Sequence, residues 1–230
     1  MEIFLDTANV DEITKWLDFG VLDGVTTNPS ILLKEGGNDM EGRVREIAKL
    51  INPRPLSVEV STNDSNEMIQ QANAFAEWAP NIVVKIPVLN EYGVPSFGVV
   101  NALEKIGIRV NMTAVLSFGQ MAMGAKAGAT YISIFAGRVS DEGNDSTRLI
   151  QESVNWLAHW NYPSKIIVGS IREAINIQDA AMARAHIITA PPQFLLKWVD
   201  HYYTRATVRT FNEDAKEAAA KMAELKLLAS

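Results

Sequence analysis

Short apolar runs alternate with segments whose apolar residues recur at helical spacing along almost the whole chain. Brief runs rich in Val, Ile and Leu are typical of buried strands, and a period near 3.6 residues is typical of amphipathic helices. The predicted strands cover 3–5, the start of 24–30, 56–60, 82–88, 107–112, 130–135, 165–169 and 186–189. The predicted helices cover 11–19, a segment after Pro29, 65–78, 97–105, 117–127, 145–159, 172–184 and a segment opened by Pro191-Pro192. The helix after Pro29 is interrupted at Gly36-Gly37 and resumes over 40–50. A polar loop is predicted over 137–144.

This order gives eight repeats of a strand followed by a helix. Strands that alternate with helices pair in parallel through right-handed crossovers, and eight repeats in 230 residues indicate a closed (β/α)8 barrel, or TIM barrel, of the α/β class. An open doubly wound sheet would need a glycine-rich phosphate loop after its first strand, and the segment 6–9 contains no glycine. We therefore expect one barrel domain over residues 1–211.

The last segment, 212–230, differs from the barrel repeats because it is rich in Ala, Glu and Lys. Acidic residues lie in its first turn, and Glu217 and Lys221 are spaced for an i,i+4 ion pair, so it is predicted to be an extra C-terminal helix. Ala218, Met222 and Leu225 form a narrow apolar seam. The seam could pack against its own barrel or against a neighbouring subunit, and the residues alone leave both open.

One charged residue, Lys85, interrupts the apolar run 82–88. A lysine is almost never fully buried without a partner, and burial favours the neutral amine, which is a nucleophile. The alternative is a lysine that lies on a less buried strand and reaches water or an ion-pair partner with its ammonium group. What surrounds Lys85 decides between these interpretations.

Polar residues gather at the carboxyl ends of the predicted strands, whereas the strand bodies are apolar. In a barrel these ends meet in one small volume, where active sites of this fold lie. The polar residues at these ends are Asp6, Thr26, Asn28, Glu59, Lys85, Asn111, Thr113, Ser133 and Ser170. Each by itself fits a structural role such as capping the next helix. Together, two carboxylates and an amine in a dry cavity suit imine chemistry, in which the lysine attacks a ketone and the acids move protons.

Two arginines that follow the sixth and seventh strands indicate an anionic substrate. Arg138 comes after the sixth strand, and Ser170 and Arg172 come after the seventh, where barrels of this class often hold a phosphate. A guanidinium group stays charged and can hold a phosphate through two hydrogen bonds. Each arginine could instead pair with the acidic run Asp141-Glu142 or with Glu173.

Composition and charge narrow the function classes further. The formal net charge is −6 and the sequence pI is about 5.2, which disfavours nucleic acid and anionic membrane surfaces as partners. The chain contains no cysteine, so disulfides, thiolate nucleophiles and cysteine-bound metals are excluded. The first residues are acidic where a signal peptide would be basic, and no apolar run is long enough to span a membrane. We expect a soluble, cytoplasmic protein.

The sequence argues against a metal centre or a nucleotide-binding loop. His159, His186 and His201 are isolated and lack the spacing of metal-binding histidine pairs. The acidic run 141–145 lacks the spacing of a calcium loop, and the glycines of 119–128 lack the Gly-Lys-Ser/Thr end of a P-loop. No metal and no cofactor are therefore expected.

Several of these segments together resemble the motifs of the transaldolase family, in its short branch that includes the fructose-6-phosphate aldolases. The matching segments are LDTA at 5–8, VTTNPS at 25–30, VVKIP at 83–87, NMT at 111–113, FAGR at 135–138 and GSIR at 169–172. They cover the whole barrel, and Thr-Thr-Asn-Pro-Ser together with a fourth-strand lysine is a specific combination. The resemblance implies a metal-free Schiff-base mechanism that transfers a dihydroxyacetone unit from a ketose phosphate to an aldose phosphate.

Carried onto the matching positions, the resemblance gives each site residue a role. It makes Lys85 the Schiff-base nucleophile and Asp6 the acid–base group during carbon–carbon cleavage, and Glu59 and Thr113 would hold the catalytic water. The residues implied to bind substrate are Thr26, Asn28, Ser133, Phe135, Arg138, Ser170 and Arg172. Among these, the two arginines and Ser170 would hold the phosphate, and the asparagine and Ser133 would bind the hydroxyls of the dihydroxyacetone unit.

Two positions separate the branches of the family. The aldolase branch carries a glutamine and a tyrosine at the positions of Glu59 and Phe135, and the transaldolase branch carries a glutamate and a phenylalanine. At these two positions this chain is therefore similar to the transaldolase branch. Ala136 and Ile171 depart mildly from the family pattern and leave open a sulfofructose transaldolase, whose donor carries a sulfonate. A fructose-6-phosphate aldolase is the other enzyme alternative. A catalytically idle, oligomeric barrel that binds sugar phosphates is the alternative from another class.

The resemblance also bears on assembly. Short members of the family form pentamer-based assemblies, often decamers, in which the C-terminal helix packs on a neighbouring subunit. It therefore implies that this chain is a homo-oligomer, a pentamer or a decamer, with 212–230 at a subunit interface.

Overall fold

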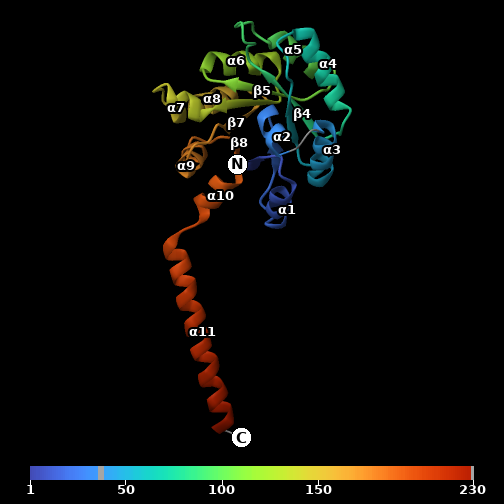
Figure 1. The fold of residues 1–230 in the computed structure, drawn as a ribbon. Coiled ribbons are helices and arrows are strands. Elements are labelled where there is room, and N and C mark those ends of the chain that lie inside the picture. Colours follow the sequence, from blue (N-terminus) through green and yellow to red (C-terminus); the bar gives the residue numbers. More distant parts are fainter. Residues whose placement is uncertain (36–38, 229–230) are drawn as a thin grey trace. The chain divides into compact units, whose positions relative to one another are not determined.

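Eight parallel strands close into a barrel within residues 1–35 and 39–228, the part of the chain that the computed structural model describes (Figure 1). The strands pair in sequence order, and the eighth pairs with the first. They are β1 (Glu2–Asp6), β2 (Gly24–Thr26), β3 (Leu56–Glu59), β4 (Ile82–Pro87), β5 (Val110–Val115), β6 (Tyr131–Phe135), β7 (Lys165–Gly169) and β8 (Ile187–Ala190). The predicted (β/α)8 barrel is confirmed.

Helices follow the strands, and several begin after a polar residue whose side chain accepts a hydrogen bond from the first turn, as Asn9, Asp64 and Asp145 do. The helices are α1 (Val10–Asp18), α2 (Pro29–Glu35), α3 (Met40–Ile51), α4 (Ser65–Ala76), α5 (Phe97–Lys105), α6 (Phe118–Ala127), α7 (Ala136–Asp141), α8 (Ser146–His159), α9 (Ala174–Met182), α10 (Pro192–Val199) and α11 (Tyr202–Leu228). The interruption predicted at Gly36-Gly37 lies outside the described residues.

The polar loop predicted over 137–144 is wrong, because the chain forms the short helix α7 directly after β6. The apolar residues of α7 are small and buried, with Ala136 and Val139 only 5% and 3% exposed. The backbone N–H of Gly137 also donates to the carbonyl of Ser170 at 3.1 Å, which holds α7 against the end of β7. Tertiary contacts therefore form a helix where the local sequence reads as a loop.

The fifth strand lies three residues later than the range 107–112 predicted for it. Gly107 has a positive φ of 85° and its N–H donates to the carbonyl of Glu104, so it belongs to the turn that ends α5. The strand begins at Val110, whose N–H donates to the side chain of Glu104 at 2.8 Å. As a result, Thr113 lies inside β5 and not after it.

The interior of the barrel has an apolar floor and a polar upper part. Side chains that face the axis near the amino ends of the strands form a buried cluster of Phe4, Val83, Tyr131, Ile167 and Ile187. Residues two apart on a strand share a face. The next residues on that face are therefore Asp6, Lys85, Ser133, Gly169 and Thr189. Gly24 leaves room in the floor, because a Cβ there would lie 2.7 Å from the ring of Phe4.

The other face of each strand packs against the helices and forms the main core. Its strand residues are apolar and almost all fully buried; examples are Leu5, Val25, Val84, Ile132 and Val168. The apolar outer face anchors the strands, so the polar groups at the opposite face hold fixed positions.

The described chain divides into two compact units, Met1–Leu195 and Leu196–Ser230. The first contains the barrel. The second contains the last half of α10 and the long helix α11, which begins at Tyr202, so the predicted boundary at 211 falls inside a helix. None of the described helices combines the length and the apolar character needed to cross a membrane.

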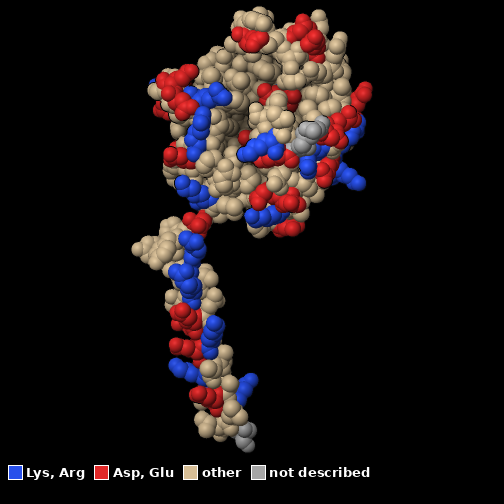
Figure 2. Space-filling model, in the orientation of Figure 1, with Lys and Arg blue, Asp and Glu red and all other residues tan. Residues whose placement is uncertain are grey.

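Helix α11 carries an exposed apolar seam along its length. The seam residues are spaced alternately by three and four positions and are Val208, Phe211, Ala215, Ala218, Met222 and Leu225. Phe211, Met222 and Leu225 are each more than 60% exposed. Figure 2 shows charged side chains of both signs along the rest of this helix. Such a spacing is typical of a helix that packs lengthwise against another one.

Candidate active site

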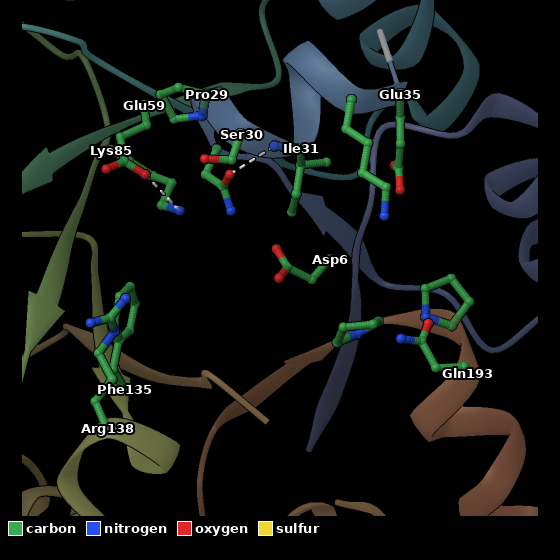
Figure 3. A pocket seen from close by; sticks show the side chains of 14 residues that line it. Asp6, Pro29, Ser30, Ile31, Glu35, Glu59, Lys85, Phe135, Arg138 and Gln193 are labelled. Carbon is green, nitrogen blue, oxygen red and sulfur yellow. Dashed lines mark hydrogen bonds and ion pairs between the residues drawn. The ribbon is translucent and has the colours of Figure 1, made fainter. Parts of the chain in front are cut away.

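A cavity of about 650 Å³ opens at the carboxyl ends of the strands, and Asp6 points into its centre (Figure 3). A smaller recess of about 160 Å³ adjoins it, because both are lined by Asp6, Asn28, Lys85, Phe135 and Arg138. Glu59 lines only the larger cavity, whereas Thr26, Ser133, Ser170 and Thr189 line only the recess. Nine of the predicted site residues thus line one continuous space, and Thr113 and Arg172 do not.

Lys85 is buried at this cavity, with a side chain only 7% exposed. Its Nζ donates to the carbonyl oxygen of Thr27 at 3.0 Å and pairs with Glu59 Oε2 at 3.1 Å. Glu59 is its direct neighbour in the register of β3 and β4. The alternative interpretation of this lysine also allowed an ion pair, so the pair with Glu59 does not decide between the two interpretations. The cavity beside Lys85 favours a chemical role.

Asp6 lies at the end of β1 and is held through one carboxylate oxygen. Thr26 Oγ1 donates to Oδ1 of Asp6 at 2.8 Å, and Thr189 Oγ1 lies 2.6 Å from the Thr26 hydroxyl. Burial raises the pKa of Asp6, and the negative charges of Glu35 and Glu59 add to the rise, while Lys85 and the Thr26 hydrogen bond oppose it. A carboxyl group with a raised pKa is suited to exchange protons with a substrate.

Glu35, the last residue of α2, fastens the loop that follows Asp6. Its Oε2 accepts hydrogen bonds from Thr7 Oγ1 and from the backbone N–H of Ala8, both at 2.7 Å. It also lines the larger cavity. Glu35 therefore acts on Asp6 in two ways, by holding the adjacent loop and through its charge.

A second polar network lies between β3, β5 and β6. Asn111 Nδ2 donates to Ser57 Oγ at 3.2 Å, and Ser133 Oγ donates to Asn111 Oδ1 at 2.7 Å. Because Ser133 uses its only proton on Asn111, it offers a ligand in the recess a lone pair. Thr113 Oγ1, further along β5, is buried and has no hydrogen-bond partner among the described residues. A buried hydroxyl of this kind suits a bound water or a reaction intermediate.

Asn28 and Phe135 complete the walls between these groups. Asn28 Oδ1 accepts from the N–H of Ile31 at 2.9 Å and so caps α2, which is the structural role that the sequence left open for it. Its side chain also lines both cavities. Phe135 ends β6 and supplies an apolar wall next to Arg138, as Figure 3 shows.

Arg138 reaches the cavity from α7 and forms no ion pair within the described residues. Ser170 follows β7 with a left-handed φ of 57°. Gly137 allows α7 and the loop after β7 to approach, because a Cβ there would lie 2.1 Å from the carbonyl oxygen of Ser170. A free guanidinium group beside a polar recess can bind an anion.

Arg172 lies outside the cavity lining. Its Nη2 donates to Asp141 Oδ2 at 2.9 Å, and both side chains are more than half exposed. The pairing with the acidic run that the sequence left open as an alternative is therefore present for Arg172 and absent for Arg138.

Sequence reasoning missed several cavity residues. Thr189 is a polar residue near the carboxyl end of the eighth strand, and the test applied to the other strands could have found it. Glu35, Lys34 and Gln193 also line the larger cavity, but they come from the end of one helix and the start of another, and no strand pattern marks them. Within the described residues, no group of three or more His, Asp or Glu side chains is placed to hold a metal ion.

The chain matches the profile of the family described as transaldolase/fructose-6-phosphate aldolase over residues 3–229. A relative from Dehalococcoides mccartyi, described as a probable transaldolase, is 39% identical over 94% of this chain and 98% of its own length. A second, from Thermoanaerobacter sp., carries the same description and is 40% identical over 96% of this chain and 100% of its own length.

Solved structures that resemble this one share its fold at low identity. A flavocytochrome b2 variant with bound sulfite superposes with a TM-score of 0.57 at 10% identity, over 84% of this chain and 57% of that one. A mandelate oxidase variant gives 0.56 at 12% identity, over 83% of this chain and 64% of that one. These likenesses support the barrel and nothing about the chemistry.

Proposed function

The chain belongs to the transaldolase/fructose-6-phosphate aldolase family, and from this premise we propose that it transfers a dihydroxyacetone unit between sugar phosphates. The donor is a ketose phosphate such as fructose 6-phosphate or sedoheptulose 7-phosphate, and the acceptor is an aldose phosphate such as erythrose 4-phosphate. The observation that carries the proposal is the buried Lys85 amine at a cavity that is also lined by the carboxylates of Asp6 and Glu59.

Lys85 forms the covalent bond to the donor. Glu59, 3.1 Å from Nζ, takes the ammonium proton, and the free amine attacks the ketone carbon of the sugar. The resulting carbinolamine loses water and leaves an iminium ion. This water is handled by Glu59 and by the Thr113 hydroxyl, which has no partner in the described part of the chain. No metal is needed, because the iminium ion itself is the electron sink.

Asp6 then breaks the carbon–carbon bond. Its carboxylate takes the proton of the C4 hydroxyl, the C3–C4 bond breaks, and its electron pair moves into the iminium group to give an enamine. The C4 oxygen becomes the carbonyl of the departing aldose phosphate. Transfer to an acceptor aldehyde is the reverse of these steps, with Asp6 returning the proton.

Arg138 and Ser170 hold the phosphate end of the substrate, and Arg172 joins them by leaving Asp141. Exchange of this partner is inexpensive, because an exposed ion pair contributes only about 0–1 kcal/mol. Asn28 and Ser133, at the recess, hold the hydroxyls of the three-carbon unit.

Reductive trapping tests the covalent step. The protein is incubated with fructose 6-phosphate, reduced with borohydride, and digested for mass spectrometry. We expect a three-carbon adduct on Lys85 and none in a Lys85→Met control. An intact protein without an adduct on Lys85 would refute the Schiff-base mechanism and favour an idle barrel that only binds sugar phosphates.

Glu59 and Phe135 support a transferase over an aldolase. Glu59 pairs directly with the amine, so its replacement by glutamine changes how water is held at the carbinolamine. The double variant Glu59→Gln with Phe135→Tyr should release a larger share of free dihydroxyacetone, measured against transfer to erythrose 4-phosphate. Unchanged partitioning would contradict the assignment to the transaldolase branch.

The anion of the donor is tested by a direct comparison. Arg138 and Ser170 can bind a phosphate or a sulfonate, so kcat/KM is measured with fructose 6-phosphate and with sulfofructose. We expect the phosphate to be the better donor by about tenfold or more, since a dianion gains more from a guanidinium pair than a monoanion does. A preference for the sulfonate would identify the sulfofructose alternative.

We also propose that α11 packs on another copy of this chain in a homo-oligomer. The apolar seam from Val208 to Leu225 supports this, because a spacing alternately of three and four positions is typical of a helix that packs lengthwise against another one. A pentamer or decamer is the assembly that the family resemblance favours.

A further inference from the structure

Thr189 is a buried hydroxyl next to the acid–base group, and none of the roles above uses it. It lies on β8, while Thr26 lies on β2, and β1 with Asp6 runs between these two strands. Both threonines are almost completely buried, at 7% and 2% exposed. Their hydroxyl oxygens are 2.6 Å apart, and Thr26 Oγ1 is also 2.8 Å from Asp6 Oδ1.

The direction of this chain of hydrogen bonds follows from counting protons. Each threonine hydroxyl has one proton to donate. Thr26 spends its proton on Asp6 Oδ1, so the short contact with Thr189 is a hydrogen bond only if Thr189 donates to Thr26. The Thr26 hydroxyl therefore accepts a hydrogen bond from Thr189 and donates its own proton to the carboxylate of Asp6.

The other carboxylate oxygen of Asp6, Oδ2, is available to exchange a proton with a substrate. No described residue donates a hydrogen bond to Oδ2, and the carboxylate points into the cavity in Figure 3. One oxygen is thus fixed by the protein, and the other faces the space in which the substrate would lie. This division selects the atom at which Asp6 takes and returns a proton.

We propose that Thr189 is a positioning residue, which orients the Thr26 hydroxyl toward Asp6 Oδ1 and so presents Oδ2, ionised, to the substrate hydroxyl. The inference rests on the proposed Schiff-base function. In the cleavage step Oδ2 accepts the C4 hydroxyl proton, the C3–C4 bond breaks, and its electrons pass to the iminium group on Lys85. Thr189 touches none of these atoms and acts only through Thr26.

The charged groups around Asp6 make this orientation consequential. Burial is the main factor that opposes the ionisation of Asp6, and Glu35 on α2 and Glu59 on β3 add to it, whereas Lys85 on β4 and the Thr26 hydroxyl favour ionisation. A hydrogen bond to the charged form lowers the pKa of a carboxyl group. Weakening the Thr26 bond therefore raises the pKa of Asp6 and moves the acidic limb of kcat/KM to higher pH.

Thr189→Val tests the inference, since it removes the hydroxyl and keeps the shape. With fructose 6-phosphate and erythrose 4-phosphate we expect kcat to fall about tenfold, KM to stay within about twofold, and the acidic limb to move to higher pH. Thr189→Ser should restore both kcat and the limb. Thr14→Val, on the exposed side of α1, is the control for the substitution itself.

Two further measurements separate positioning from a general structural effect. In Thr26→Val, the additional Thr189→Val change should alter kcat by less than about twofold, because its only route to Asp6 is gone. Borohydride trapping of Thr189→Val should still label Lys85, but with a larger share of uncleaved six-carbon adduct.

The outcomes are distinct. A wild-type protein that gives no Lys85 adduct overturns the proposed function itself. If the wild type is labelled, any one of three results overturns the role of Thr189 alone. These are a normal pH profile in Thr189→Val, equal losses of kcat in the Ser and Val variants, and a full additional loss of kcat in the Thr26→Val background. If Thr189→Val does not fold, Thr189→Ala is measured by the same profile.

Discussion

At the scale of single residues, two carboxylates face one amine from different surroundings. Glu59 forms the ion pair with Lys85, while Asp6 is held by a neutral hydroxyl and has a pKa raised by burial. Carboxylates placed in such different environments can take different roles in one reaction. The division favours Glu59 at the amine and its water, and Asp6 at the sugar hydroxyl.

Asp6→Asn is expected to abolish transfer and to stabilise the fold at neutral pH. Loss of the acid–base group should lower kcat about 10²–10⁴-fold. Because the folded pKa of Asp6 lies above its ordinary 3.8, its protonation favours the folded state below that value, and this contribution is lost as pH rises through the folded pKa. The gain of the variant over the wild type in unfolding free energy should therefore grow between pH 4 and 7 in denaturant titrations. A constant difference would contradict the raised pKa.

Glu35→Gln is expected to change the pH profile through charge. Removing this anion lowers the pKa of Asp6, so the acidic limb of kcat/KM should move to lower pH, opposite to the shift expected for Thr189→Val. The weaker bonds to Thr7 and Ala8 should cost about 1 kcal/mol of unfolding free energy. Glu46→Gln, an exposed site on α3, is the control and should leave the limb in place. A shift to higher pH would refute the electrostatic role of Glu35.

At the scale of elements, the short helix α7 and the loop after β7 together form the end of the cavity that we propose to hold the anion. They are joined by the hydrogen bond from Gly137 to the Ser170 carbonyl, and Gly137 has no room for a side chain. Arg138 projects from this helix and Ser170 from this loop, so the spacing between the two elements sets the spacing of the groups proposed to bind the anion.

Gly137→Ala is expected to weaken substrate binding more than it weakens catalysis. The new methyl group would meet the Ser170 carbonyl at 2.1 Å and push the two elements apart, at a cost of about 1–3 kcal/mol of stability. KM for fructose 6-phosphate should rise about tenfold or more, with kcat changed less. Gly98→Ala on α5, where a methyl group would meet nothing within 4 Å, is the matched control and should leave KM unchanged. If Gly137→Ala folds and its KM is unchanged, the contact between Gly137 and the Ser170 carbonyl does not set the geometry of the anion site.

At the scale of the whole molecule, the barrel and the helix α11 have opposite surface properties. The barrel packs most of its apolar residues into a core, whereas α11 has no buried residue and carries a regular apolar seam. The cytoplasmic location predicted from composition and the oligomer predicted from the family resemblance both stay predictions. The seam makes the second one accessible to a simple test.

Ala218→Glu is expected to break the assembly, while Ala220→Glu is not. Ala218 lies in the seam and Ala220 on the opposite side of the same helix, so the two changes introduce the same side chain into the same helix. Burying a carboxylate in a helix interface costs several kcal/mol, enough to dissociate subunits at micromolar concentration. Light scattering after size exclusion measures the mass. Equal masses for the two variants would show that the seam is not the interface.

The sequence by itself determined the barrel and nine of the residues that line the cavity at its strand ends, because the placement of the strands depends on local periodicity. Apolar runs with a period of two place Asp6, Lys85 and Thr26 on the inner face of their strands, and the closure of parallel strands brings such residues together. The same rule applied to β8 would have included Thr189.

Only the tertiary structure decided which polar groups touch. Thr26 and Thr189 are separated by 163 positions in the chain, and Glu35 reaches the loop at Ala8 from the end of a helix. The pairing of Arg172 with Asp141, and the helix at 136–141, also depend on how neighbouring loops pack. Hydrogen bonds and ion pairs require atoms within a few ångströms, and a pattern along the chain does not contain those distances.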